Sequence, residues 1–452
     1  MTPTPVIAIF DVGKTNKKLF LFDEHYRIVF EKSLQFEETI DEDGDPCEDL
    51  MALTAWGRDS LQQLSALEQF DIRALNFSAY GASFVHIDKV GKPVTPLYNY
   101  LKPFPEKLKA KFYEDYGGEL SVSTSTASPV LGHLNSGMQL YWLKYEQPAA
   151  FEKINFALHL PQYLSFLVTG EAFSDITSIG CHTNLWDFSN NTYHEWVIRE
   201  KINKKLPPIF ASSEVVEARA FWKDLKVGVG LHDSSAALIP YLACFTEPFI
   251  LISTGTWCIT LNPFNTDPLT EAELKQDCLC YMSYRGDAVK ASRLFAGNEH
   301  EIETRRLATF FDVPLDEYRN VTYNEEITRK LAGETPVMPQ LKFADRDLQA
   351  YESYDVAYHQ LMLDIMWQQL VSTKLVIGSG GVKRIFVDGG FSKNSIYMHL
   401  LAEAFPEMEV FAASVAQATA VGAALAIHKH WNSLPLPGDI IDLKFYTKPS
   451  IV

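Results

Sequence analysis

The chain has few of the residues that would place it among metal-stapled or membrane proteins. Its 452 residues include only six cysteines, and Cys278 and Cys280 lack the spacing and the matching second pair of a zinc site. No stretch approaches the roughly 20 consecutive apolar residues of a membrane span. No basic segment followed by a longer apolar run opens the chain. We therefore expect a cytoplasmic protein with reduced thiols and no membrane partner.

Positive charge is also scarce. Lys and Arg number 40 against 57 Asp and Glu, which gives a net charge of −17. Such a surface repels nucleic acids and anionic membranes, so no nucleic-acid partner is expected. A phosphate-bearing ligand would have to be held locally by backbone N–H groups, a metal ion or a few placed cations. The acidic run at residues 36–49 lacks the ligand pattern of a calcium-binding EF-hand, and we interpret it as a solvated surface.

The chain lacks a Ser/Gly-rich linker, although its length exceeds the size at which single cores stop growing. Two domains packed against each other are therefore expected. An apolar strand at residues 6–10 leads into a polar corner at 11–16, and a second apolar strand at 249–252 leads into a corner at 253–256. The similarity suggests an internal repeat. Strand–turn–strand units are also common in unrelated α/β proteins, so spacing alone leaves the repeat open.

The remaining periodicity predicts an alternation of helices and strands. Helices are predicted at residues 50–70, 299–311, 355–371, 392–405 and 412–426, and strands at 28–35, 72–78 and 384–388. The helix at 412–426 consists almost wholly of small residues, so it should pack very close to a neighbour. The fold class is therefore α/β with two domains.

Asp233 and the two polar corners are the candidates for chemistry. A carboxylate among small residues can approach a substrate and accept a proton. The sequence Asp-Ser-Ser before an apolar run is also typical of a helix start, and the two interpretations are compatible. Gly13-Lys14-Thr15 is not a P-loop, because Ala8 stands where that motif requires glycine. The alternative interpretation of Lys14 and Lys17 is a solvated hairpin tip.

A series of motifs in fixed order resembles the FGGY carbohydrate kinases. The motifs are Asp11-Val12-Gly13, SDITSIGCHTNLWD, LPPIFASSEVV, GLHDSSAAL, STGTW, VDGGFSKN and ASVAQATAVGAALA, and they cover nearly the whole chain. Within the family the chain looks most like the rhamnulokinase branch. The resemblance implies two ribonuclease-H-like domains of the actin-like ATPase architecture. Residues 1–242 would hold the sugar and a phosphate corner, and residues 243–452 the nucleotide, with ATP and Mg²⁺ in the cleft between them.

The same resemblance assigns roles to individual residues. Asp233 is expected to be the general base, and Asp11 the Mg²⁺ ligand. The expected nucleotide contacts are Gly13, Lys14, Thr15, Asn16, Thr254, Gly255, Thr256, Gly389, Gly390 and Asn394, and the expected sugar contacts are Gly81, Phe84, His232 and Asp233. A lone Gly-Gly after a strand is more often a simple turn, so the assignment of Gly389 and Gly390 to the nucleotide site rests mainly on the resemblance.

Two departures from the family pattern concern the sugar and phosphate sites. Lys14 stands between Gly13 and the expected Thr or Ser, and an expected Arg-Asp pair is replaced around residues 98–100. The predicted function is an ATP-dependent kinase of a small ketose, with L-rhamnulose as first candidate. L-Fuculose, xylulose, ribulose or glycerol are alternative substrates, and a sugar or nucleotide sensor is an alternative function. The sequence leaves the oligomeric state open, a homodimer being one alternative.

Overall fold

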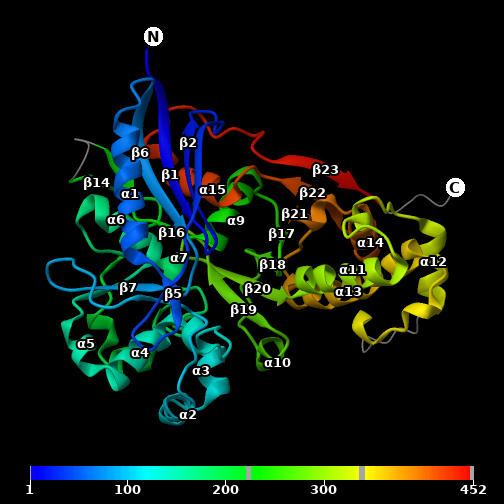
Figure 1. The fold of residues 1–452 in the computed structure, drawn as a ribbon, viewed down its shortest axis with the longest axis horizontal. Helices are drawn as coiled ribbons and strands as arrows, with labels where there is room; N and C mark the ends of the chain where they lie inside the picture. Colours follow the sequence, from blue (N-terminus) through cyan, green and yellow to red (C-terminus); the bar gives the residue numbers. More distant parts are fainter. Residues whose placement is uncertain (1, 220–224, 335–341, 448–452) are drawn as a thin grey trace.

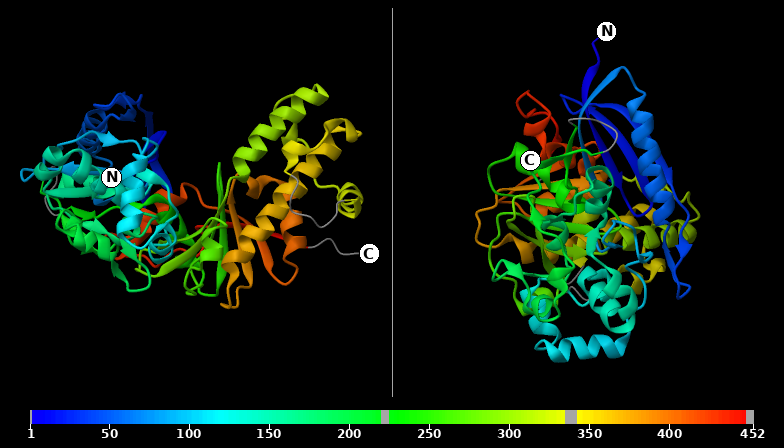
Figure 2. Two further views of the ribbon diagram at one scale, coloured as in Figure 1. Left: turned by 90° about the horizontal axis from the view of Figure 1, so that it is seen from below. Right: turned by 90° about the vertical axis from the view of Figure 1, so that its left-hand side faces the viewer.

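The structure is a computed structural model that describes residues 2–219, 225–334 and 342–447. Figures 1 and 2 show two lobes, each built on a mixed β-sheet. Helices α9 (Asp233–Cys244) and α15 (Ala418–Ala426) lie between the two sheets, in the centre of Figure 1. None of the helices in the described ranges is long and apolar enough to cross a lipid bilayer.

The two sheets share a common strand arrangement. In each, three antiparallel strands lie side by side, β3-β2-β1 or β20-β18-β17. The last of the three pairs in parallel with β6 or β21, which pairs in parallel with β15 or β22. The second sheet has β19 as an additional strand at its edge. The expected internal repeat is therefore present in the fold. The strands of the first sheet are β14 (Val215–Glu217), β15 (Lys226–Gly228), β6 (Phe70–Ala79), β1 (Thr4–Val12), β2 (Asn16–Asp23), β3 (Ile28–Gln35) and β16 (Leu231–His232). Those of the second are β19 (Cys278–Met282), β20 (Ala288–Leu294), β18 (Cys258–Asn262), β17 (Phe249–Thr254), β21 (Arg384–Gly389), β22 (Glu409–Ser414) and β23 (Asp442–Tyr446).

Helices and short strands surround these sheets. The first lobe carries α1 (Leu50–Ser65), α2 (Glu106–Asp115), α3 (Glu119–Ser125), α4 (Ser136–Glu146), α5 (Pro148–Lys153), α6 (Leu160–Thr169), α7 (Ile176–Ile179) and α8 (Glu195–Arg199). The second carries α10 (Glu271–Leu274), α11 (Ala296–Phe311), α12 (Glu325–Glu334), α13 (Tyr354–Ile377) and α14 (Ser395–Ala404). Short strands add four small sheets to the first lobe. They are formed by β4 (Thr39–Ile40), β5 (Pro46–Glu48) and β8 (Leu97–Tyr98), by β7 (Phe84–Ile87) and β9 (Phe156–His159), by β10 (Ser174–Asp175) and β13 (Ile209–Phe210), and by β11 (Trp186–Asp187) and β12 (Thr192–Tyr193).

The predicted helix at residues 412–426 is wrong in its first part. Residues 409–414 form β22, which pairs in parallel with β21. The helix begins only after Gln417, whose left-handed backbone (φ 56°) ends the strand segment. Small residues satisfy both structures, and the tertiary pairing with β21 decides between them.

The close packing predicted for the second part is correct. Gly422 of α15 faces Ala236 of α9, and a Cβ on Gly422 would lie 1.8 Å from the Ala236 carbonyl oxygen. The two backbones are therefore in contact. Around them, apolar residues of both sheets form one continuous core, to which Ile9 and Leu251 contribute from the two sides.

Gly422→Ala is expected to lower the melting temperature, because the added Cβ forces α9 and α15 apart. Overpacking of this kind typically costs about 1 to 3 kcal/mol. Gly57→Ala in α1 is the matched control, since its Cβ would meet nothing within 4 Å. That variant should gain about 0.5 to 1 kcal/mol. Thermal unfolding of both variants measures the difference, and a Gly422→Ala protein as stable as wild type would contradict the contact.

Candidate active site

Three neighbouring strands of the first sheet bring two carboxylates to one edge. Ser78 of β6 pairs with Asp11 of β1 on one side and with Leu231 of β16 on the other. Asp233 follows β16 directly and is the first residue of α9. Two strand spacings correspond to about 10 Å. The two acids therefore border one space, and the negative charge of Asp233 contributes to a raised pKa at Asp11.

The Asp233 carboxylate is partly open to solvent. Its side chain is 31% exposed, and its Oδ1 accepts hydrogen bonds from the Ser234 backbone N–H (2.6 Å) and the Ser234 hydroxyl (3.2 Å). The surrounding protein raises the pKa of Asp233 to about 6 by desolvation, which the Ser234 bonds only partly offset. The group is thus mostly ionised at neutral pH and is a better base than an ordinary aspartate.

His232 lies beside Asp233 and is electrically neutral. Its Nε2 is 3.2 Å from Asp233 Oδ1 and 3.2 Å from the sulfur of Cys181. Burial lowers the pKa of His232 to about 4, so the ring is neutral at pH 7 and its contact with Asp233 is not an ion pair. A Cβ on Gly81 would lie 2.9 Å from the imidazole ring. Glycine is therefore needed at 81, and the structure brings together these three predicted sugar-site residues.

Phe84, the fourth predicted sugar contact, is fully buried. Its ring stacks on His159 with centroids 3.9 Å apart, inside the core beneath the site. In this structure Phe84 supports the surrounding loops and presents no surface to the space beside Asp233.

Asp11 is held from the second half of the chain. Its Oδ2 accepts a hydrogen bond from the Thr419 hydroxyl at 2.8 Å. Burial is the main cause that raises the pKa of Asp11 to about 6. Lys18 stands opposite Asp11 in the β1–β2 hairpin and lowers that pKa; its ammonium also donates to Gln417 at 3.0 Å. Sequence reasoning did not single out Lys18, although the hairpin register alone pairs it with Asp11.

The first polar corner turns tightly. The Gly13 N–H donates to the Asn16 carbonyl oxygen at 2.9 Å, and Thr15 and Asn16 are exposed at the tip. Two of its lysines are already engaged. Lys17 is buried against Glu48 (2.6 Å), and Lys14 pairs with Glu38 (2.6 Å).

Lys14 lies on the side of the site that carries Tyr80, Asn99 and Tyr100. Its ammonium is 5.9 Å from the centre of the Tyr80 ring, and Glu38, its ion-pair partner, accepts a hydrogen bond from Asn99 at 3.2 Å. The charges of both Lys14 and Asp233 act on the neighbouring Tyr100 hydroxyl. The residues that replace the expected Arg-Asp pair thus lie beside Lys14.

The second polar corner is interlocked with the glycine pair. Thr254 and Gly389 are partners in the β17–β21 pairing, and a Cβ on Gly389 would lie 1.9 Å from the Thr254 carbonyl oxygen. The Thr254 hydroxyl donates to the Asp388 carbonyl oxygen (2.6 Å) and accepts from the Phe391 N–H (3.0 Å). Gly390 donates its N–H to the Thr254 carbonyl oxygen at 2.9 Å. Thr254 therefore joins the second polar corner to residues 388–391 through these hydrogen bonds.

The exposed part of this corner is made of small groups. Gly255, Thr256, Gly389 and Gly390 all lie at the surface. The start of α11 closes against them: a Cβ on Gly297 would lie 1.8 Å from the Gly255 carbonyl oxygen. Such a surface gives a phosphate or ribose close access to the backbone. Sequence reasoning missed Gly297, which carries no local motif.

Asn394 is the N-cap of α14. Its side-chain oxygen accepts from the Tyr397 N–H at 3.1 Å, and its amide donates to the Tyr358 hydroxyl at 2.7 Å. Asn394 therefore caps α14, the helix that follows the glycine pair, and links it to α13.

The second lobe also reaches the residues around Asp233. The Tyr281 ring stacks on His232 with centroids 5.9 Å apart, and the Ser235 hydroxyl donates to the Met282 carbonyl oxygen at 2.9 Å. Arg293 lies over the ring of Trp257, which is 42% exposed beside Thr256. Both lobes therefore contribute walls to one site.

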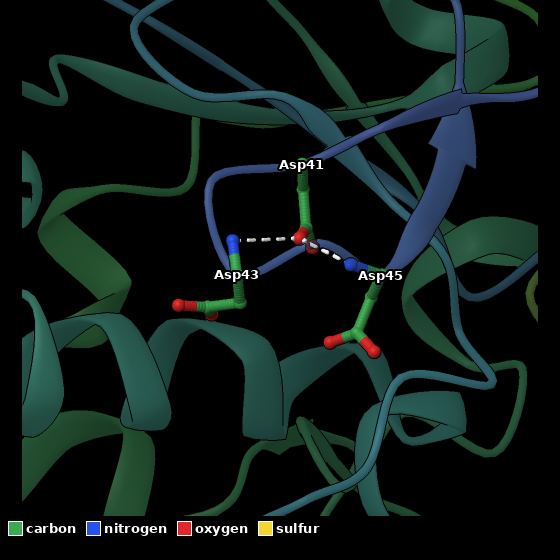
Figure 3. Close-up of side chains that lie close together, drawn as sticks. All are labelled: Asp41, Asp43 and Asp45. Atoms are coloured by element: carbon green, nitrogen blue, oxygen red, sulfur yellow. Dashed lines mark hydrogen bonds between the residues drawn. The ribbon is translucent and has the colours of Figure 1, made fainter.

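A cluster of three aspartates elsewhere has the spacing of a metal site. Ligand oxygens of Asp41, Asp43 and Asp45 lie within 4.8 Å of one another (Figure 3). The Lys102 ammonium fills this position, at 2.7, 2.9 and 2.7 Å from the three carboxylates. Burial alone would raise the pKa of Asp41, but the bonds from Lys102 and from two backbone N–H groups outweigh it and hold the pKa below its usual value. The prediction of a solvated acidic surface is therefore wrong for Asp41, whose side chain is fully buried.

Comparisons with known proteins agree with this architecture. The solved carbohydrate kinase from Novosphingobium aromaticivorans superposes with a TM-score of 0.78 at 22% identity, covering 99% of this chain and 95% of that one. A rhamnulokinase from Halalkalibacterium halodurans is 26% identical over 267 residues, 55% of this chain and 52% of the relative. An L-fuculokinase from Escherichia coli K12 is 24% identical over 271 residues, 57% of this chain and 56% of the relative. The matched part thus spans about half the length of these curated relatives.

The fold and the site define the class as the two-domain α/β sugar kinases. Two family profiles match the chain: "FGGY family of carbohydrate kinases, N-terminal domain" over residues 6–239, and "Carbohydrate kinase FGGY, C-terminal domain" over residues 246–434. The chain belongs to the FGGY family of carbohydrate kinases.

Lys102→Met is expected to destabilise the protein by about 3 to 5 kcal/mol, because three carboxylates lose their buried cation. The emptied oxygen cluster is the ligand set that Ca²⁺ prefers. Millimolar Ca²⁺ should therefore restore part of the lost melting temperature in Lys102→Met and leave wild type unchanged. Lys111→Met, which removes an exposed pair with Asp115 on α2, is the control and should change little. A Lys102→Met protein with wild-type stability would contradict the role of this ammonium.

Proposed function

We propose that this protein transfers the γ-phosphoryl group of ATP to a hydroxyl of a neutral ketose, with L-rhamnulose as first candidate. The observation that carries the proposal is Asp233, a partly exposed carboxylate with a pKa raised to about 6, beside Asp11 at the edge shared by both lobes. In the reaction, the sugar oxygen bonds to the γ-phosphorus, its proton passes to Asp233, and the bond to ADP breaks.

Asp11 is the residue proposed to hold Mg²⁺. It faces a second carboxylate and one cation, Lys18, and both acids have raised pKa values, so the site carries an unbalanced negative charge when both ionise. A divalent cation with oxygen ligands suits this donor set. When bound, it would neutralise charge on the transferring phosphoryl group. Lys18 and the exposed backbone of Gly255 and Thr256 are proposed to position the phosphates, and residues 389–390 to admit the nucleoside.

The charges on the side of the site that carries Lys14 and Tyr100, where the sugar is proposed to bind, favour a neutral sugar. Lys14 is balanced by Glu38, and Lys17 by Glu48, so this wall has no net charge to offer an anion. It presents the Lys14 ammonium, the Glu38 carboxylate and the Tyr100 hydroxyl, which together can donate to and accept from sugar hydroxyls. The similarity to a rhamnulokinase and an L-fuculokinase favours a six-carbon deoxyketose over glycerol.

A coupled assay of ADP release with a panel of acceptors tests the proposal. L-Rhamnulose, L-fuculose, xylulose, ribulose and glycerol are each supplied with ATP and Mg²⁺. We expect ADP release that depends on a ketose, with the highest kcat/KM for L-rhamnulose. Sugar binding without turnover of any acceptor would contradict the kinase assignment and favour a sensor.

The value of kcat/KM should decrease as the pH drops below about 6, the pKa of Asp233, because Asp233 must be ionised to accept the proton. At limiting Mg²⁺ the slope of log(kcat/KM) against pH should approach 2 on the acid side. The reason is that Asp11 titrates in the same range and must ionise to bind the metal. Saturating Mg²⁺ should remove the Asp11 contribution and leave that of Asp233. A profile that stays flat down to pH 4.5 would contradict Asp233 as the base.

Asp233→Asn should lower kcat by about 100-fold or more, with little change in ATP affinity. Its melting temperature at pH 8 should rise, because an aspartate with a raised pKa destabilises the fold when ionised, and the amide removes that charge. Asp71→Asn, which changes an exposed carboxylate paired with Arg73, is the control and should leave both quantities near wild type. Turnover above a tenth of wild type would argue against the role of Asp233.

A further inference from the structure

A cavity of about 670 Å³ lies at the opposite end of α9 from Asp233. Its walls include Ile239, Leu242 and Ala243 of α9 and Leu425 and Ala426 of α15. The 12 residues of α9 span about 18 Å, so the cavity is remote from the carboxylates of the candidate active site. Neither polar corner lines it.

Both lobes contribute to this cavity. Phe264 follows β18 of the second sheet, and Tyr284 and Arg285 form the turn between β19 and β20. With Phe245, three aromatic residues line the cavity. An occupant would therefore touch both halves of the molecule at the junction of α9 and α15.

Two cations on the cavity have no carboxylate partner among the residues that the structure describes. Arg285 donates only to the hydroxyl of the adjacent Tyr284, at 3.0 Å, and Lys429 makes no ion pair or side-chain hydrogen bond within those ranges. Glu214 is the one carboxylate on the wall, 3.9 Å from His430. Arg285 and Lys429 are both exposed, so their cationic groups are accessible to an occupant of the cavity. They favour an anionic group on the ligand.

The other residues that line the cavity indicate the chemistry of the uncharged part of the ligand. The lining also includes Ser213, Thr246 and His428, which can bond polar atoms of a ligand. Its aromatic and aliphatic side chains would find no apolar partner in inorganic phosphate. A flat apolar body suits three aromatic rings, and the volume is that of an ordinary small-molecule site. We propose that this cavity binds an organic anion with a flat apolar body and one negatively charged group, at a site separate from the sugar and nucleotide. The proposal does not depend on the proposed function.

The test uses the fluorescent probe 1-anilinonaphthalene-8-sulfonate, which has this chemistry, on the full-length protein. We expect one saturable site. In Arg285→Met/Lys429→Met the Kd should rise by about tenfold or more, since charge-assisted hydrogen bonds are lost. Ala243→Trp, which fills the cavity from α9, should abolish the saturable signal. The control Lys107→Met/Lys204→Met removes two exposed cations away from the cavity and should bind as wild type.

Competition identifies the part of the ligand that matters. Benzoate, which joins a flat apolar body to an anionic group, should displace the probe, whereas inorganic phosphate at the same concentration should not. Equal probe affinity in wild type, in Arg285→Met/Lys429→Met and in Ala243→Trp would place the probe elsewhere and overturn the proposal. Displacement by inorganic phosphate as effective as that by benzoate would overturn the requirement for an apolar body.

Discussion

The contact between α9 and α15 determines where the other parts of the molecule lie. At their crossing, the backbone of Gly422 touches the carbonyl group of Ala236 without an intervening side chain. The N-terminal end of α9 carries Asp233, and that of α15 carries Thr419, which binds Asp11. A helix pair that crosses at backbone distance has little freedom to slide. The crossing therefore fixes the two acids relative to each other and joins the two sheets through one core.

The electrostatics of the chain follow from its shortage of cations. Two buried structural carboxylates have a lysine against them: Lys17 lies against Glu48 and Lys102 against Asp41. Asp11 and Asp233 receive no such partner at ion-pair distance within the described residues, and desolvation raises both pKa values. This imbalance is typical of sites at which a metal ion or a proton is exchanged. Asp175 also has a pKa raised to about 6 by burial, but its carboxylate is satisfied by the hydroxyls of Thr177 and Ser212.

Local sequence patterns predicted the parts of this fold that depend on local structure. The two hairpins, the repeat they indicate and the position of Asp233 at a helix start follow from apolar runs and turn residues near one another in the chain. The small residues at 412–426 were ambiguous, because alanine and valine fit both β22 and α15, and the partner strand β21 decides the outcome. The acidic loop was misread because Lys102, its cation, lies 57 residues from Asp45. Gly297 and Thr419 were missed for the same reason, since their partners lie in distant segments.

The central claim is that the carboxylate of Asp233 accepts the proton of the sugar hydroxyl while the two lobes hold the nucleotide. A crystal structure with a non-hydrolysable ATP analogue, Mg²⁺ and the best acceptor from the panel tests it most directly. The account predicts one sugar hydroxyl within about 2.6 to 3.2 Å of an Asp233 oxygen and in line with the γ-phosphorus. A sugar bound with all of its hydroxyls beyond hydrogen-bond reach of Asp233, or a metal bound away from Asp11, would contradict it.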